Sequence, residues 1–231
     1  MSDRPSIYLA SPNTNWLHAA LVSRLMQWLV TGKASWRLNF KMATPHHRVR
    51  NALHKDFVKF DKEFHFTHVL WVDSDTIPPL NGLDKLLEDD KDIVSGAVTN
   101  WKRWGPQPVA WSRSEGGYLV LPPPQWNGLQ KVDIGTLAFC LMKADVLRQM
   151  PPGCFYWLET DEWKTDGKSE DTVFFEHAQD AGFEAYVDFD VWCSHVKELD
   201  MMDVMKLMSP DRDEILKMFL EGDDIEAGDA K

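Results

Sequence analysis

A single stretch in the first half of the chain decides the fold, and it reads His68-Val69-Leu70-Trp71-Val72-Asp73-Ser74-Asp75-Thr76-Ile77-Pro78-Pro79. Its unbroken apolar run indicates a strand that is buried on both faces, and the proline pair ends that strand. Asp73 and Asp75 are therefore expected at the carboxyl end of a central strand, where open α/β sheets bind ligands. Because side chains two residues apart on a strand point the same way, we expect the two carboxylates to converge.

Two converging carboxylates suit a divalent cation. Mg²⁺ and Mn²⁺ prefer hard oxygen ligands and often bridge phosphate oxygens. The plainer interpretation is a turn with an aspartate cap after an ordinary strand, and an isolated Asp-x-Asp is more often of that kind. The rest of the chain has to decide between the two.

Strand and helix patterns alternate along the chain. Strands are expected at residues 6–10, 36–42, 68–73, 92–98, 132–142, 183–189 and 191–196, and helices are expected before residue 30 and at 49–60, 80–87, 143–150 and 169–181. This order predicts an α/β domain with a mostly parallel, Rossmann-like central sheet flanked by helices.

Composition limits the class of protein. The 231 residues suffice for one large or two small domains, and 44% hydrophobic with 26% charged residues is typical of a soluble globular protein. No apolar run approaches the ~20 residues that span a bilayer, and no signal peptide is recognisable at the N-terminus. The three cysteines form no C-x-x-C pair, so a reducing, cytoplasmic setting is expected.

The charge is unevenly distributed. A net charge of −11 argues against a general nucleic-acid binder. Residues 33–62 nevertheless carry an excess of Lys and Arg, which could face phosphates or form a solvated helix face. Residues 198–231 hold eleven acidic and four basic residues, and 221–231 are expected to be a disordered acidic tail.

Two stretches, residues 99–128 and 151–168, are rich in tryptophan, other aromatic residues and proline. Neither can form long regular elements, and most of their rings are expected to cover the core. Trp101 and Trp157 are candidates for an acceptor site, because flat apolar rings pair well with sugar faces. Between the two stretches, Gly135 would let the backbone approach a ligand closely, although a glycine in a turn is the commoner case.

A second group of polar residues lies near the C-terminal end of the fold. Ser169 or Asp171 can cap the helix that follows, and capping alone would explain the acids Glu170 and Asp171. A carboxylate at a helix start could also act as a general base toward an attacking hydroxyl. His195 ends the last strand and could be a core histidine or a metal ligand.

These residues, in this order, resemble a GT-A glycosyltransferase, the fold of nucleotide-sugar-dependent transferases. The resemblance covers roughly residues 5–197, and small single-domain members of this kind are frequent in bacteriophage and bacterial genomes. It would place a phage protein in the host cytoplasm. The matching features are Leu9-Ala10-Ser11-Pro12, Arg50-Asn51, Asp73-Ser74-Asp75, Gly96, Trp101-Lys102, Gly135-Thr136, Glu170-Asp171 and the closing strand to His195.

The resemblance implies an activity and a domain plan. The chain would transfer a sugar from a nucleotide diphosphate sugar, most commonly a UDP-sugar, to a hydroxyl acceptor, with Mn²⁺ or Mg²⁺ as cofactor. Residues 1–220 would form the domain, with a nucleotide-binding half at 5–100, an acceptor half at 101–197 and C-terminal helices at 198–220, followed by the tail at 221–231.

The resemblance also implies roles for the matched residues. Asp73, Asp75 and His195 would hold the metal, with Asp75 the more direct ligand. Asp171, with Glu170, would serve the acceptor, as the base if the reaction inverts the anomeric centre. The nucleotide would contact Ser11, Pro12, Asn13, Arg50, Asp73, Ser74 and Asp75, and the donor sugar or acceptor would contact Trp101, Lys102, Gly135, Thr136 and Trp157.

Other classes of protein stay open. A nucleotidyltransferase shares the sheet and an acid-bound Mg²⁺, but it normally has a glycine-rich basic loop after its first strand, where this chain has Ser11-Pro12-Asn13. A non-catalytic carbohydrate-binding or interaction module would use the tryptophans and would have no need for the acids and His195. A nucleic-acid base as acceptor would use the basic segment, but the overall charge disfavours it.

Overall fold

The computed structural model describes residues 4–13, 16–102, 105–115, 117–158 and 167–197. Residues 1–196 form one compact unit and residues 197–231 form another. The C-terminal helices and acidic tail expected at 198–231 lie outside the described residues. In the part of the chain that is described, no helix is long and apolar enough to cross a membrane.

The core of the fold is a mixed sheet whose central strands lie in the order β2-β1-β3-β10-β5-β11. Five of these six strands run in the same direction, and only β10 is antiparallel to its neighbours. The predicted fold class, an α/β domain with a mostly parallel central sheet, is confirmed. Their bounds are β1 Ser6–Asn13, β2 Ser35–Met42, β3 His68–Val72, β5 Ile93–Lys102, β10 Phe139–Lys143 and β11 Ala185–His195.

Short strands extend this sheet at the end near β11. β4 (Thr76–Ile77) and β9 (Leu129–Val132) pair antiparallel with β11, and β6 (Gly105–Pro108) pairs antiparallel with β5. A separate hairpin is formed by β7 (Trp111–Ser114) and β8 (Gly117–Val120). In residues 99–128, where no long regular element was expected, the end of β5 is followed only by the short strands β6, β7 and β8 and the 3₁₀ turn η1 (Pro123–Gln125) among the described residues.

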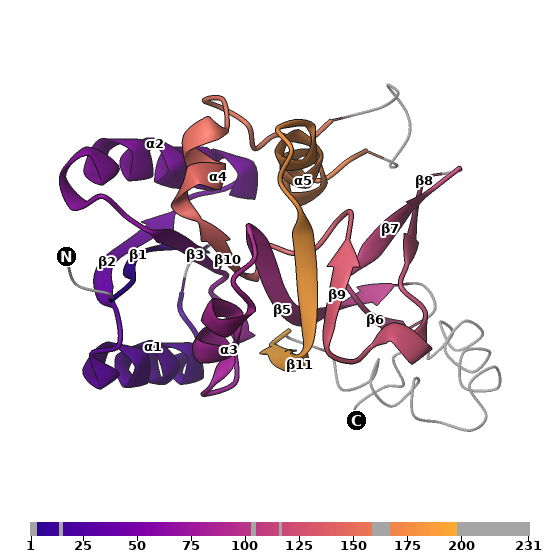
Figure 1. Cartoon of the computed structure of the whole chain (residues 1–231), viewed down its shortest axis with the longest axis horizontal. Coiled ribbons are helices and arrows are strands. Elements are labelled where there is room, and N and C mark those ends of the chain that lie inside the picture. The colour runs from indigo at the N-terminus through magenta and orange to yellow at the C-terminus, as the bar shows by residue number, and fades with distance from the viewer. Residues whose placement is uncertain (1–3, 14–15, 103–104, 116, 159–166, 198–231) are drawn as a thin grey trace, which may run out of the picture. The chain divides into compact units, whose positions relative to one another are not determined.

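Helices cover both faces of the sheet (Figure 1). One apolar core lies beneath α1 (Ala19–Thr31) and α3 (Gly82–Asp89). The other lies beneath α2 (His46–Phe64), α4 (Ala144–Gln149) and α5 (Glu170–Asp180). Strands β1, β3 and β10 between them are buried on both sides, which is why β3 reads as a continuous apolar run.

The helix boundaries follow the capping signals of the sequence. Gly32 ends α1 in the left-handed conformation with φ of 64°, which glycine adopts without a steric penalty. Ser169 caps α5, and its side chain accepts a hydrogen bond from the Thr172 amide. Of the two predicted caps, Ser169 therefore takes that role, and Asp171 is left for another.

The first strand is longer than predicted. β1 continues beyond Ala10 to Asn13 because β2 pairs with it along its whole length. Its pairing with β3 ends at the register Ala10–Trp71. Pro12 therefore borders only one neighbouring strand, which is a position where a strand tolerates a proline.

The strand predicted at 132–142 is wrong in part, because the chain breaks there into β9 and β10. β9 pairs with β11, whereas β10 lies between β3 and β5. Residues 133–138 must cross between these two places, so they cannot remain in one strand. The two strands predicted at 183–196 are instead one strand, β11, with a shift of register between Asp188 and Trp192.

Candidate functional site

The candidate site follows the carboxyl ends of β1 and β3. β3 ends at Val72, and the next three residues form a turn. This turn is held by hydrogen bonds from the Asp73 amide to the Ala138 carbonyl (2.9 Å) and from the Thr76 amide to the Asp73 carbonyl (3.2 Å). The alternation of side chains along a strand therefore does not extend to Asp73 and Asp75, and the two carboxylates have different partners.

Asp75 lies against His195. β4 pairs with the end of β11 in a register that places Thr76 opposite His195, and the Val196 amide donates to the Asp75 carbonyl at 2.8 Å. The Asp75 Oδ2 atom is 3.5 Å from the His195 Nε2 atom. These two residues are 120 positions apart in the sequence, and the sheet brings them together.

The imidazole of His195 is oriented by the backbone. Its Nδ1 atom is 2.7 Å from the Thr99 carbonyl oxygen, which can only accept a hydrogen bond. Nδ1 therefore carries a proton, and in the neutral ring Nε2 presents a lone pair toward Asp75. A histidine that donates one ring N–H to a carbonyl and offers the other nitrogen is typical of metal-ligating histidines.

Asp73 is directed to Arg50 instead. The Arg50 Nη2 atom donates to both carboxylate oxygens of Asp73, at 3.1 and 3.3 Å. Among the described residues, no three His, Cys, Asp or Glu side chains form a cluster placed to hold a metal ion. The structure therefore brings Asp75 and His195 together but does not add Asp73 to them as a third ligand.

Arg50 is the centre of a buried cluster of charges. Its side chain is 2% exposed, and its Nε atom lies 3.6 Å from Glu170 Oε1 and 3.4 Å from Asp171 Oδ1. With Asp73, three carboxylates surround one guanidinium. The charge of Arg50 is therefore directed to these acids, which differs from the expectation that Arg50 contacts the nucleotide directly.

Asp171 lies at the start of α5 with its side chain 21% exposed. Its Oδ2 atom accepts a hydrogen bond from the Leu137 amide at 3.1 Å, and its Oδ1 atom has no hydrogen-bond partner in the described part of the chain. Burial raises the pKa of Asp171 to about 6; Arg50 lowers it, and the nearby Glu170 and Asp73 charges raise it. A carboxyl with such a pKa can exchange a proton near neutral pH.

The end of β1 contributes polar side chains to the same edge of the sheet. Ser11 is fully buried and Asn13 is 6% exposed. Neither the Ser11 Oγ atom nor the Asn13 Oδ1 atom has a hydrogen-bond partner among the residues described. Buried polar atoms are seldom left without partners, so these two atoms are candidates for contacts with a ligand. Pro12 lies between them, and Ser74 is 8% exposed in the turn after β3.

The residues predicted for the sugar side have different environments. Thr136 is 4% exposed, and a Cβ atom on Gly135 would meet the Phe175 ring at 3.1 Å and the Ser95 hydroxyl at 3.2 Å. Close packing is therefore one reason for this glycine. Trp157 is 54% exposed. Trp101 and Lys102 end β5, and their side chains lie outside the described part.

The sequence analysis quoted Asn51 beside Arg50 but gave it no role, and this residue joins α2 to the segment before α5. The Asn51 side chain donates to the Phe155 carbonyl (2.6 Å) and accepts from the Phe155 amide (3.2 Å). The Phe155 ring stacks on Phe174 of α5 with centroids 5.1 Å apart, and it meets Trp71 of β3 edge-on at 5.4 Å. Only the adjacency of Asn51 to Arg50 on one helix could have suggested this contact.

The chain matches no protein-family model and no sequence among curated proteins. Its fold is similar to the crystal structure of A197 from STIV, with a TM-score of 0.55 and 13% identity over 84% of this chain and 86% of that chain. It is also similar to the crystal structure of GalNAc-T7 with UDP, GalNAc and Mn²⁺, with a TM-score of 0.51 and 9% identity over 99% of this chain and 53% of that chain. At these identities the likeness shows the fold alone: this chain has a GT-A-like α/β fold.

Proposed function

We propose that this protein is a glycosyltransferase that moves a sugar from a nucleotide diphosphate sugar, most simply a UDP-sugar, to a hydroxyl acceptor with the help of Mn²⁺ or Mg²⁺. The observation that carries the proposal is the Asp75–His195 pair, 3.5 Å apart at the carboxyl edge of the sheet, where α/β folds bind ligands. The similar fold of GalNAc-T7, whose structure holds UDP, GalNAc and Mn²⁺, supports the same class of ligands.

The residues at this edge fit a divalent cation. Asp75 offers a carboxylate oxygen, and His195 offers a ring nitrogen whose orientation the Thr99 carbonyl fixes. Mg²⁺ and Mn²⁺ are commonly held by one or two protein ligands together with water and substrate phosphates, so two side chains suffice. When bound, such a cation neutralises the diphosphate as it leaves.

Asp171 is proposed as the general base. The Leu137 amide donates to its Oδ2 atom and its Oδ1 atom faces Arg50 Nε at 3.4 Å, so the carboxylate is held in one orientation, and the exposed part of the side chain, 21%, would take the hydroxyl proton of the acceptor. Because burial raises its pKa to about 6, the carboxylate is the main form at pH 7 and is more basic than an ordinary aspartate. This role applies if the anomeric centre is inverted. In a retaining reaction Asp171 would instead orient sugar or acceptor hydroxyls.

The nucleotide is proposed to lie along the ends of β1 and β3. Ser11 and Asn13 have unpaired oxygen atoms there among the described residues, and Asp73 and Ser74 form the adjacent turn. Arg50 holds Asp73 and Asp171 in place from beneath, and we assign it this positioning role in place of a direct nucleotide contact. Trp157, half exposed, is the candidate surface for a sugar ring.

The test is a thermal-shift screen of nucleotide diphosphate sugars and nucleoside triphosphates, each with and without Mn²⁺. A ligand that binds only the native state raises the melting temperature. We expect a nucleotide diphosphate sugar to raise the melting temperature only when Mn²⁺ is present. The variants Asp75→Asn and His195→Ala should lose this rise.

Asp92→Asn serves as the control, because Asp92 precedes β5 at the opposite edge of the sheet. It should keep the full Mn²⁺-dependent shift. A shift produced only by nucleoside triphosphates would favour the nucleotidyltransferase class. An unchanged shift in both site variants would remove the proposed cation site.

A further inference from the structure

Two adjoining cavities lie at the amino ends of β1 and β2, on the opposite side of the sheet's strand ends from the candidate site. One cavity, of about 680 Å³, has a lining that includes Arg4, Lys33, His68, Asp84, Leu87 and Glu88. The other, of about 520 Å³, has a lining that includes Trp28, Trp36, Leu80 and Leu83. The two cavities share Lys33, Asp84 and Leu87, so they adjoin.

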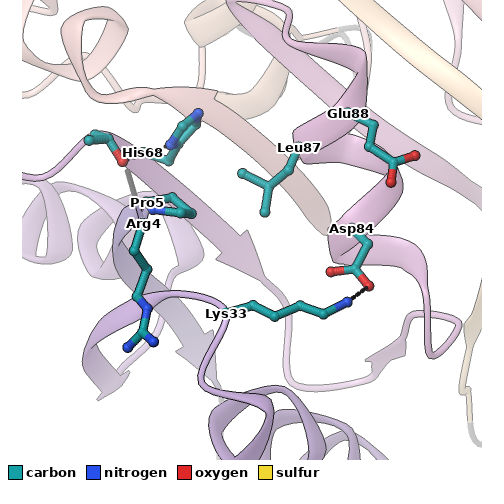
Figure 2. Close-up of a pocket in the computed structure, with 8 residues that line it drawn as sticks. Arg4, Pro5, Lys33, His68, Asp84, Leu87 and Glu88 are labelled. Carbon is teal, nitrogen blue, oxygen red and sulfur yellow. Dashed lines mark hydrogen bonds and ion pairs between the residues drawn. The ribbon is translucent and has the colours of Figure 1, made fainter. Parts of the chain in front are cut away.

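The positive and the negative side chains of the first cavity lie on two different walls. Arg4 and Lys33 come from the segments that precede β1 and β2, whereas Asp84 and Glu88 are one turn apart on α3. Figure 2 shows Lys33 reaching across to Asp84, with Arg4 and Glu88 on opposite sides and Leu87 pointing between them. Burial and the nearby Lys143 lower the pKa of His68, so its ring adds no charge near neutral pH.

The second cavity is mostly apolar. The indoles of Trp28 and Trp36 and the side chains of Leu80 and Leu83 line it. The Lys33–Asp84 ion pair, with Nζ and Oδ2 2.6 Å apart, stands at the boundary between the apolar and the charged cavity. Both side chains are partly exposed, at 61% and 38%, so this ion pair adds little to stability, and its partners can be exchanged at small cost.

We propose that these adjoining cavities form a binding site for an α-amino acid with a large apolar side chain. Because Lys33 and Asp84 already touch, a ligand that replaces their ion pair must carry its own two charges close together. An α-amino acid does so on a single carbon. Its carboxylate would meet Lys33, and its ammonium would meet Asp84 and Glu88. Its side chain would enter the cavity lined by the two indoles.

The test is an NMR titration of the full-length ¹⁵N-labelled protein with L-phenylalanine. We expect saturable shifts of the amide signals of residues 33–36 and 83–88. Two analogues carry one charge each: 3-phenylpropanoate lacks the ammonium, and 2-phenylethylamine lacks the carboxylate. Each should bind at least about tenfold more weakly than L-phenylalanine. The Lys33–Asp84 ion pair would have to separate, but only one of these two residues would gain a charged partner from the ligand.

Variants assign the effect to the two walls. Lys33→Met and Asp84→Asn should each weaken L-phenylalanine binding by about tenfold or more. Lys131→Met is the matched control, because the Lys131–Glu184 ion pair has similar exposure, 62% and 52%, on another part of the sheet. The spectrum of each variant without ligand checks that the variant is folded. If one of the two wall variants does not fold, the other one still tests the proposal.

Several results would overturn the proposal. They are the absence of saturable shifts up to the solubility of L-phenylalanine, shifts centred on other residues, equal binding of a one-charge analogue, and unchanged affinity in both wall variants. The cavities would then be surface depressions that an ordinary ion pair spans. None of these readouts depends on transfer activity, so the proposed glycosyltransferase function is tested separately.

Discussion

Arg50 carries more of the site's electrostatics than any other described residue. Its guanidinium, 2% exposed, faces Asp73, Glu170 and Asp171, and no other Lys or Arg is paired with these three acids in the described residues. A buried charge is tolerated when opposite charges and hydrogen bonds compensate it, and loss of one partner leaves the others uncompensated. The three acids therefore depend on a single residue of α2.

Replacement of Arg50 by Met is expected to lower the free energy of unfolding by about 3–5 kcal/mol, because three buried or partly buried carboxylates would lose the one cation that is paired with them in the described part of the chain. Urea unfolding at pH 7.5 measures this loss. Arg148→Met is the control, since Arg148 also contacts carboxylates, those of Asp61 and Asp145, but is 37% exposed. Its loss should be nearer 1 kcal/mol, and equal losses in the two variants would contradict the assignment of Arg50.

Asp171→Asn is expected to stabilise the fold at neutral pH while it removes turnover. The folded-state pKa of about 6 is above the usual 3.8, so the fold disfavours the ionised form. The stability associated with the protonated form is present below the usual pKa and is lost as the pH rises through 6. Asparagine resembles the protonated form at every pH, so the variant escapes this loss.

The gain should be on the order of 1–3 kcal/mol above pH 7 and should disappear in acid, as measured by thermal unfolding across pH. Asp180→Asn, at the exposed far end of α5, should show no such pH-dependent gain. A variant less stable than the wild type at pH 8 would show that the ionised carboxylate is favoured. Transfer activity retained in Asp171→Asn would discard the general base.

At the scale of elements, α2 organises the site by contacts at successive positions. Arg50 reaches the acids of the turn after β3 and of α5. Asn51 holds the main chain of Phe155. His54 Nε2 lies 3.0 Å from the Leu147 carbonyl oxygen, to which it donates a hydrogen bond. Since Phe155 packs between Trp71 and Phe174, one helix sets the separation of β3 and α5, which carry the acids.

Asn51→Ala is therefore expected to destabilise the fold by about 2 kcal/mol, because it leaves a partly buried amide and carbonyl of Phe155 without their partners. Urea unfolding is the measurement. Asn127→Ala is the control, since the Asn127 side chain donates one hydrogen bond to the Pro124 carbonyl at an exposed position. Similar effects of the two substitutions would mean that the Phe155 contact is not special.

The contact between β5 and β11 depends on a missing side chain. A Cβ atom on Gly96 would lie 2.8 Å from the Val191 carbonyl oxygen and 2.9 Å from the Phe139 ring. Gly96→Ala is expected to cost about 1–3 kcal/mol by overpacking. Gly135→Ala, whose nearest contacts would be 3.1 and 3.2 Å to side-chain atoms, should cost less, and the reverse order in urea unfolding would contradict this account.

At the scale of the whole molecule, the chain divides at residue 196. All buried apolar residues of the described part lie between Ile7 and Cys193, and the Val196 amide closes the strand pairing on Asp75. A chain that ends at Lys197 is therefore expected to fold and to unfold cooperatively, with nearly the melting temperature of the full chain. Calorimetry of the two chains checks this, and a large loss in the shorter chain would show that residues 198–231 support the fold.

Local sequence patterns determined which segments form strands and helices. The apolar run before Asp73, the periodic apolar positions of α1 and α2, and the caps at Gly32 and Ser169 act over a few residues, so they can be read without the fold. Their alternating order also predicted the class of sheet. The pattern failed at 132–142, where pairing with distant strands divided one apolar run into β9 and β10.

Tertiary structure alone decided how the polar residues are grouped. The sequence placed Asp73, Asp75 and His195 at strand ends, but the turn after β3 directs Asp75 to His195 and Asp73 to Arg50. It likewise buried much of the Asp171 side chain at the start of α5, and this burial raises the pKa of Asp171 only in the folded state, while the neighbouring Arg50 guanidinium lowers it. Hydrogen-bond partners and burial depend on which elements pack together, and a side chain's charge acts on neighbours in space regardless of their distance in sequence.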